Sequence, residues 1–194
     1  MNDKVVLRAL KRGDVDRRDL DASARRLLEL VRKASDNFDP DAKADHDAHH
    51  AAARRIASQS AVLLKNNGVL PLDPASRVLL VGTFATSPRF QGSGSSKINP
   101  TRVDTLAGIL EHEYPDLPVR LHDTFDPLEE NDLSNLRQDY DGVIVMAGLP
   151  DAMESEGFDR DTLDLPQDQV DLISAIATNH DNTVVLLSNG APVT

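Results

Sequence analysis

Four short apolar runs alternate with segments of helical periodicity in the part of the chain after Pro71. Each run is too short for a helix but fits a buried strand, and the runs lie at 78–82, 119–121, 143–146 and 184–187. The helical patterns between them lie around 102–113, 129–138 and 167–179. Strands separated by helices need crossover connections, which favour a parallel sheet with helices on both faces. The alternation therefore predicts an α/β fold, a three-layer α/β/α sandwich with a mainly parallel sheet.

The segment before these runs predicts an N-terminal helical extension. Residues 16–35 place apolar side chains at helical spacing, preceded by aspartates that are candidate N-caps. An aspartate-rich stretch around 36–45 is broken by a proline and buries little apolar surface, so it predicts a linker. A second helical pattern runs over 46–66 and stops before a glycine. We therefore divide the chain into residues 1–45 and a sandwich domain of residues 46–194.

Charge and composition exclude several classes of function. The 194-residue chain has a formal net charge of -11 at pH 7, which repels nucleic-acid phosphates and anionic lipids alike. It has no cysteine, which excludes disulfide frameworks and thiolate metal sites. No apolar run approaches the roughly 20 residues that span a bilayer, and the first residues lack the apolar core of a secretory signal. We expect a cytoplasmic protein with no nucleic-acid or membrane partner.

Two loops that follow strands are candidate ligand sites, because ligands of an open parallel sheet bind at the carboxyl ends of its strands. The first loop, 83–100, is rich in small residues that let the backbone approach a ligand closely. Its hydrogen-bonding side chains suit a ligand with hydroxyl groups, and they are Gln91, Ser93, Ser95, Ser96 and Asn99. A flexible surface loop is the alternative on composition alone. A phosphate-binding loop is disfavoured, because Lys97 does not lie in a GxxxxGK[ST] frame.

The second loop, 148–165, gathers charged side chains after the third apolar run. Glu154, Glu156, Asp159 and Arg160 lie within seven residues of one another. Neighbouring carboxylates raise one another's pKa, and an arginine can hold one of them ionised, which is how a general acid is kept protonated near neutral pH. Charge pattern alone favours a solvated acidic loop instead.

Other constellations carry less chemistry. His46 and His50 lie at i, i+4 spacing that can chelate a metal, but no glutamate accompanies them in HExxH order. Aspartates in the capping region of a helix explain that cluster better. No GxSxG elbow follows a strand. We therefore expect no metal and no cofactor.

Three stretches together resemble glycoside hydrolase family 3, of β-glucosidase type. They are SAVLLKNNGVLPL at 60–72, FQGSGSSKINPT at 90–101 and ESEGFDRDTLDLPQDQVDLI at 154–173. The segment 13–31 is similar to the last helix of the barrel domain that precedes the sandwich in this family. The resemblance implies that residues 1–45 are the tail of a (β/α)8 barrel and a linker, and that 46–194 are the C-terminal sandwich, incomplete at its end. We expect the chain to be part of a longer enzyme.

The resemblance also implies a reaction and its residues. Family members of this type are retaining enzymes that hydrolyse terminal O-glycosidic bonds, with a nucleophilic aspartate on the barrel and an acid/base glutamate on the sandwich. Loops of the GEGY form align that glutamate with Glu156, and loops of the ETKGD form align it with Glu154. We expect Glu156 as the acid/base, with Glu154 as the alternative. The implied sugar-binding residues are Gln91, Ser93, Ser95, Ser96, Asp159 and Arg160.

The implied partners are a β-linked glycoside or oligosaccharide and the barrel domain. Because the nucleophile belongs to the barrel, we expect the 194-residue chain to be inactive by itself. Two alternatives come from other functional classes. One is a noncatalytic α/β binding module of flavodoxin-like shape, and the other is a carbohydrate-contacting domain that assembles with a separate barrel chain. A flavin titration separates the first from a hydrolase.

Overall fold

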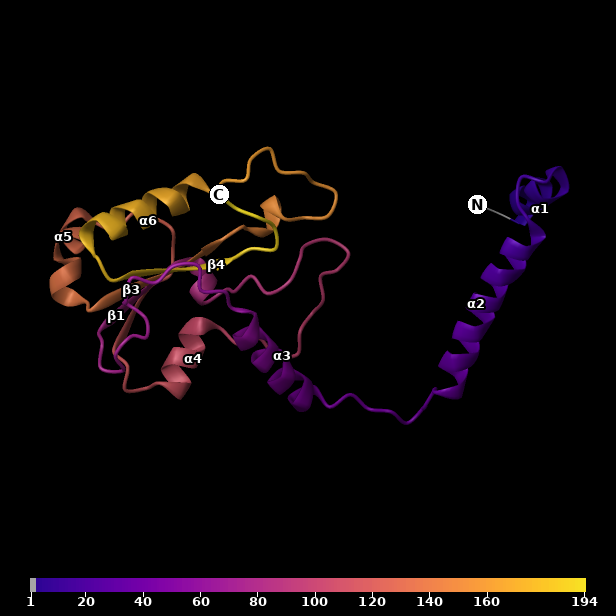
Figure 1. The fold of residues 1–194 in the computed structure, drawn as a ribbon. Helices are drawn as coiled ribbons and strands as arrows, with labels where there is room; N and C mark the ends of the chain where they lie inside the picture. The colour runs from indigo at the N-terminus through magenta and orange to yellow at the C-terminus, as the bar shows by residue number, and fades with distance from the viewer. Residues whose placement is uncertain (1–2) are drawn as a thin grey trace. The chain divides into compact units, whose positions relative to one another are not determined.

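The computed structural model describes residues 3–194, which divide into two compact units between His49 and His50. The first unit is helical (Figure 1), with α1 at Asp3–Arg12 and α2 at Arg17–Asp36. Asp16 caps α2 by accepting a hydrogen bond from the Arg18 backbone N–H. The predicted helix at 16–35 is therefore confirmed within one residue at each end.

The second unit is built on one sheet of four parallel strands. The strands are β1 at Val78–Val81, β2 at Val119–His122, β3 at Gly142–Gly148 and β4 at Thr183–Ser188. They lie in the order β2-β1-β3-β4, and every neighbouring pair is parallel. The connecting helices are α4 at Leu106–Glu113, α5 at Glu130–Asp139 and α6 at Gln167–Asn179. Two short 3-10 helices, η1 at Thr83–Ala85 and η2 at Asp151–Met153, follow β1 and β3.

Helices cover both faces of this sheet, with α5 and α6 on one face and α4 on the other (Figure 1). On the α5 and α6 face, Leu79 and Val143 pack with helix residues Leu136 and Ile176 in the main apolar core. All four β1 residues are buried, because β1 is an inner strand with neighbours on both sides. The structure is therefore the predicted three-layer α/β/α sandwich.

The helix that begins at residue 46 is shorter than the sequence pattern indicates. The helix α3 spans His46–Ser60, not 46–66. The Ser60 hydroxyl donates to the Ile56 carbonyl, a side-chain bond that competes with helix continuation. Further on, the Asn66 side chain accepts from the Gly68 and Leu70 N–H groups and donates to the Leu70 carbonyl, so it organises a turn and not a helix end.

Within the second unit, a hydrogen bond and an ion pair hold the part of α3 from His50 onward against α4 and the segment before it. His50 Nε2 lies 2.9 Å from Asp104 Oδ2, and Arg54 Nη2 lies 2.7 Å from Glu113 Oε1 at the end of α4.

Of the residues from 3 to 194, no helix combines the length and apolarity that a membrane span requires.

Candidate active site

The loops after β1 and β3 lie side by side at the carboxyl edge of the sheet. Because β1 and β3 are adjacent and parallel, their loops leave the sheet at the same edge. An isolated parallel bridge joins Ser93 of the first loop to Ser155 of the second. The expectation that loops 83–100 and 148–165 share one edge is therefore confirmed.

Glu156 contacts the first loop directly. Its Oε2 accepts a hydrogen bond of 2.9 Å from the Ser95 backbone N–H and another from the Ser95 hydroxyl. These bonds, the hydroxyl first, lower the pKa of Glu156 below its ordinary value. The side chain is otherwise exposed to solvent, so a ligand can reach the carboxylate.

Gly94 allows this close approach of the two loops. Its φ of +91° lies in the left-handed region, and a Cβ there would lie 2.6 Å from Glu156 Cβ. A larger residue at 94 would therefore push the loops apart.

Glu154 lies in a different environment, although it is only two residues from Glu156. Its side chain is 9% exposed, and its Oε2 lies 2.9 Å from Arg89 Nη1, whose own side chain is 8% exposed. Glu154 Oε1 also accepts hydrogen bonds from the Gly190 N–H at 2.9 Å and the Ala191 N–H at 2.6 Å. Both of its oxygens are thus occupied by donors of the protein.

Arg89 extends this network to other parts of the edge. Its Nη1 donates to the Leu149 carbonyl at 2.6 Å, and its Nε lies 3.0 Å from Asp151 Oδ1. Lys97 pairs with the same aspartate at 3.1 Å and is the largest cause of a lowered pKa at Asp151. The Ser188 hydroxyl at the end of β4 donates to the Arg89 carbonyl at 2.9 Å.

The remaining predicted sugar-binding residues lie on the same two loops but do not converge on Glu156. Gln91 closes its own loop, since Nε2 donates to the Ile98 carbonyl and Oε1 accepts from the Ile98 N–H. Arg160 Nη2 donates to the Pro192 carbonyl at 2.7 Å instead of pairing with a glutamate. Ser96 and Asp159 are exposed. The implied sugar-binding roles of Asp159 and Arg160 stay predictions.

The sequence did not predict a role for Arg89, which contacts the segments after both β3 and β4 at the carboxyl edge of the sheet. The available signal was weak: Arg89 is the one basic residue between 78 and 96, in a loop otherwise made of small, apolar and amide side chains. A cation in such a segment is buried only with partners, and those partners come from residues 60 or more positions further along the chain.

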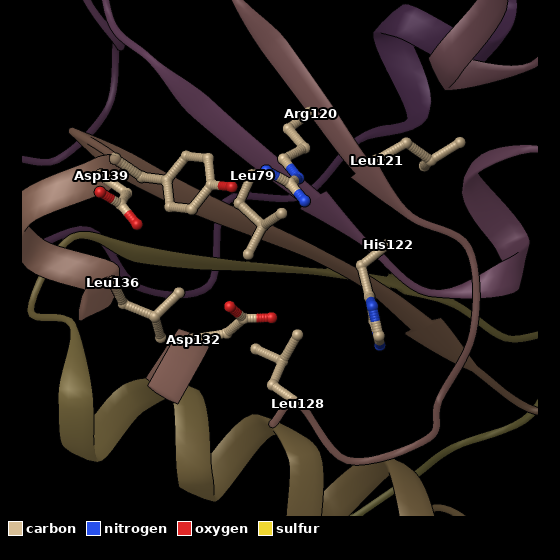
Figure 2. Close-up of a pocket in the computed structure, with 9 residues that line it drawn as sticks. Leu79, Arg120, Leu121, His122, Leu128, Asp132, Leu136 and Asp139 are labelled. Atoms are coloured by element: carbon tan, nitrogen blue, oxygen red, sulfur yellow. The ribbon is translucent and has the colours of Figure 1, made fainter. Parts of the chain in front are cut away.

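A cavity of about 110 Å³ lies in another part of the sandwich, between the sheet and α5. Figure 2 shows residues that line it. Leu79, Leu128 and Leu136 are among its apolar lining residues, and Arg120, His122 and Asp132 are among the polar ones. No residue of the loops 83–100 and 148–165 lines it, so it is separate from Glu156.

Within residues 3–194, no three His, Cys, Asp or Glu side chains are grouped so as to hold a metal ion.

The structure has the parallel α/β sandwich that the family resemblance implies, and Glu156 lies exposed between two loops at the carboxyl edge of its sheet. The sequence matches the glycosyl hydrolase family 3 C-terminal domain over residues 61–194, and the chain belongs to this family. It is similar, with 39% identity over 100% of its length, to thermostable β-glucosidase B of Acetivibrio thermocellus, of which it covers 27%. It is 37% identical over 99% of its length to an exo-α-(1→6)-L-arabinopyranosidase of Bifidobacterium longum, of which it covers 28%.

Solved structures give the same result. The chain superposes on the family 3 β-glucosidase of Bifidobacterium adolescentis with a TM-score of 0.79 and 36% identity, covering 99% of this chain and 29% of that one. It also superposes on β-glucosidase 3B of Thermotoga neapolitana with a TM-score of 0.76, where 23% identity supports the fold alone; 97% of this chain and 31% of that one are covered. The chain thus spans less than a third of the length of these relatives.

Proposed function

We propose that this chain supplies the acid/base half of the active site of a retaining glycoside hydrolase of β-glucosidase type, with Glu156 as the acid/base. In this reaction the protonated acid gives its proton to the departing glycosidic oxygen, and the resulting carboxylate then activates the water that releases the sugar. The observation that supports the proposal best is the exposed position of Glu156 between the two strand-end loops.

The surroundings of the two glutamates favour Glu156 over Glu154 in this role. An acid/base has to reach the substrate oxygen and exchange protons with it and with water. Glu156 is exposed and accepts its hydrogen bonds from Ser95 through one oxygen. Glu154 has both oxygens bound to Arg89 and to backbone N–H groups of the protein, so neither is free for that exchange.

Because the pKa of Glu156 is lowered, another group has to raise it before Glu156 can act as a general acid. The donors on Ser95 favour the charged form of Glu156, whereas a general acid has to be protonated near neutral pH. In retaining enzymes a second carboxyl group lies about 5–5.5 Å away, and its negative charge raises the pKa of the acid. We propose that this carboxylate belongs to a barrel domain, and that residues 1–45 are the tail of that barrel and its linker.

A chimera tests the proposal. Residues 1–194 replace the matching segment of the Acetivibrio thermocellus β-glucosidase, which is 39% identical to them over 100% of this chain. Glu156→Ala in the chimera should slow hydrolysis of alkyl glucosides far more than of nitrophenyl glucosides, because a good leaving group needs little protonation. Azide should partly restore turnover of the nitrophenyl substrate. The chain without the barrel should show no turnover above a Glu154→Ala/Glu156→Ala control.

Glu154→Gln in the same chimera is the matched comparison. If Glu154→Gln shows the leaving-group dependence and azide rescue while Glu156→Ala does not, the assignment is wrong. Aryl α-L-arabinopyranosides belong in the same assay, because relatives named as arabinopyranosidases match this chain almost as well as the β-glucosidase, with 37% identity. Turnover of that substrate in preference to the glucoside would change the sugar assignment but not the role of Glu156.

A further inference from the structure

The buried pair of Arg89 and Glu154 joins all three loops that leave β1, β3 and β4 at the carboxyl edge. We propose that this pair positions the acid/base loop: it fixes the segment that carries Glu156 against the segment that carries Ser95. Arg89 and Glu154 are thus positioning residues, and the inference rests on the proposed role of Glu156. Glu154, which the sequence offers as the alternative acid/base, would then position the loop and not transfer the proton.

The guanidinium of Arg89 binds the β3 loop at three places. It donates to the Leu149 carbonyl at 2.6 Å, lies 3.0 Å from an Asp151 carboxylate oxygen, and lies 2.9 Å from Glu154. A planar fork with several donors fixes both distance and orientation, which a point charge does not. Because Arg89 belongs to the β1 loop, these contacts fix one loop relative to the other.

Glu154 and Arg89 both extend the connection to the segment after β4. Glu154 accepts from the Gly190 and Ala191 N–H groups, and the Arg89 carbonyl accepts from the Ser188 hydroxyl. Both side chains are more than nine-tenths buried. Removing Arg89 therefore leaves the Glu154 carboxylate away from water without its charged partner, and removing Glu154 leaves Arg89 with Asp151 as its remaining carboxylate partner. A buried pair with partners on three loops holds those loops in one arrangement.

The connection from this pair to the proposed acid/base is short. Ser155, between the two glutamates, pairs with Ser93, and the next residue, Glu156, accepts from Ser95. Arg89 is four residues before Ser93 on the same loop. Loosening the Arg89 and Glu154 pair should therefore separate Glu156 from Ser95, although neither mutated side chain contacts Glu156 in the structure.

Carbon-13 NMR of the Glu156 carboxyl group in the 194-residue chain tests this without any substrate. Glu156→Gln assigns the signal. Three variants are compared with the parent: Arg89→Met, Glu154→Gln, and the double variant, which removes both charges and leaves neither unpaired. We expect the titration midpoint of Glu156 to move upward in all three, since the donors on Ser95 are lost. The Ser95 amide signal should at the same time lose its response to Glu156.

A mere through-space charge effect predicts a different pattern. Removing the arginine charge would raise the midpoint, removing the glutamate charge would lower it, and the double variant would stay near the parent. That pattern, or unchanged midpoints in all three, overturns the proposal. If the double variant does not fold, Arg89→Lys replaces it: lysine keeps the charge but cannot hold Glu154, Asp151 and Leu149 together, so a smaller upward shift is expected, and an unchanged midpoint refutes the proposal.

Arg137→Met is the matched control, because it removes an exposed arginine that pairs with Asp181 on another part of the sandwich. It should leave the Glu156 midpoint unchanged. The readout concerns only the geometry of Glu156 in this chain. A failed positioning proposal is therefore distinguishable from a failed assignment of the acid/base, which the chimera tests.

Discussion

A single methyl group at Gly94 should separate the two loops that hold Glu156. The Cβ of an alanine there would lie 2.6 Å from Glu156 Cβ, and ordinary contacts between carbon atoms are about 3.5–4.0 Å. Glu156 Cβ is attached to the backbone and cannot rotate away, so the loops have to move apart by roughly an ångström. The hydrogen bond of 2.9 Å from Ser95 N–H to Glu156 would then exceed bonding distance and be lost.

Gly157 offers a control that separates the backbone strain of Gly94→Ala from its steric clash with Glu156. Gly94 has φ +91° and Gly157 has φ +84°, so alanine at either position costs about 1–2 kcal/mol of left-handed strain. A Cβ at Gly157 would meet no atom within 4 Å. Gly157→Ala thus carries the strain without the clash, and any additional loss of stability in Gly94→Ala comes from the close approach of the loops.

The assay combines urea unfolding followed by circular dichroism with NMR titration of Glu156. Both variants should be less stable because alanine is strained in the left-handed region. Only Gly94→Ala should raise the titration midpoint of Glu156 and abolish the response of the Ser95 amide signal to the titration of Glu156. If the two variants have the same stability and the same Glu156 midpoint, the loops do not approach each other as the structure indicates. The contact between Ser95 and Glu156 would then be refuted.

Other predictions concern the apolar core and the loss of folding stability at low pH. Leu136→Ala, at a side chain that is 1% exposed, should lower the free energy of unfolding by about 2–5 kcal/mol in urea, whereas Leu121→Ala, at 42% exposure, should cost far less. Hydrogen bonds from Arg77 lower the pKa of Asp141 from 3.8 to about 2, so this pair stabilises the fold above pH 3.8 and its contribution is lost as the pH falls toward 2. Arg77→Met removes the side-chain hydrogen bonds to Asp141 but keeps the bond from the Arg77 backbone N–H, so it should weaken that part of the acid dependence, and an unchanged slope over this range would contradict it.

The sandwich could be predicted from local pattern because each strand is a short apolar run with its own turn signals. Val78 to Val81 are buried on both faces, so the sequence there is continuously apolar and the strand is unambiguous. The end of α3 could not be predicted in the same way. Asn66 resembles a helix C-cap in sequence, but its side chain organises a turn with Gly68 and Leu70, which depends on a competition that helical periodicity does not reveal.

The site could be predicted only as far as topology determines it. The order of strands and helices brings the loops after β1 and β3 to one edge, and this places Ser95 near Glu156. Charge pattern treats Glu154 and Glu156 alike, because they are identical residues two positions apart. What separates them is burial beside Arg89, and that burial depends on contacts between residues about 60 positions apart.

The different surroundings of the two glutamates have a consequence for catalysis. Glu156 by itself has a lowered pKa, so in this chain it is ionised near neutral pH and not ready to donate a proton. A second carboxylate raises that pKa only if it lies within a few ångströms, and the effect falls steeply with distance. A mobile Glu156 would therefore lose its proton by moving away from that charge. On the proposed assignment of Glu156 as the acid/base, rigid placement of its loop by buried partners such as Arg89 and Glu154 is consequently a condition for acid catalysis, in addition to its contribution to folding.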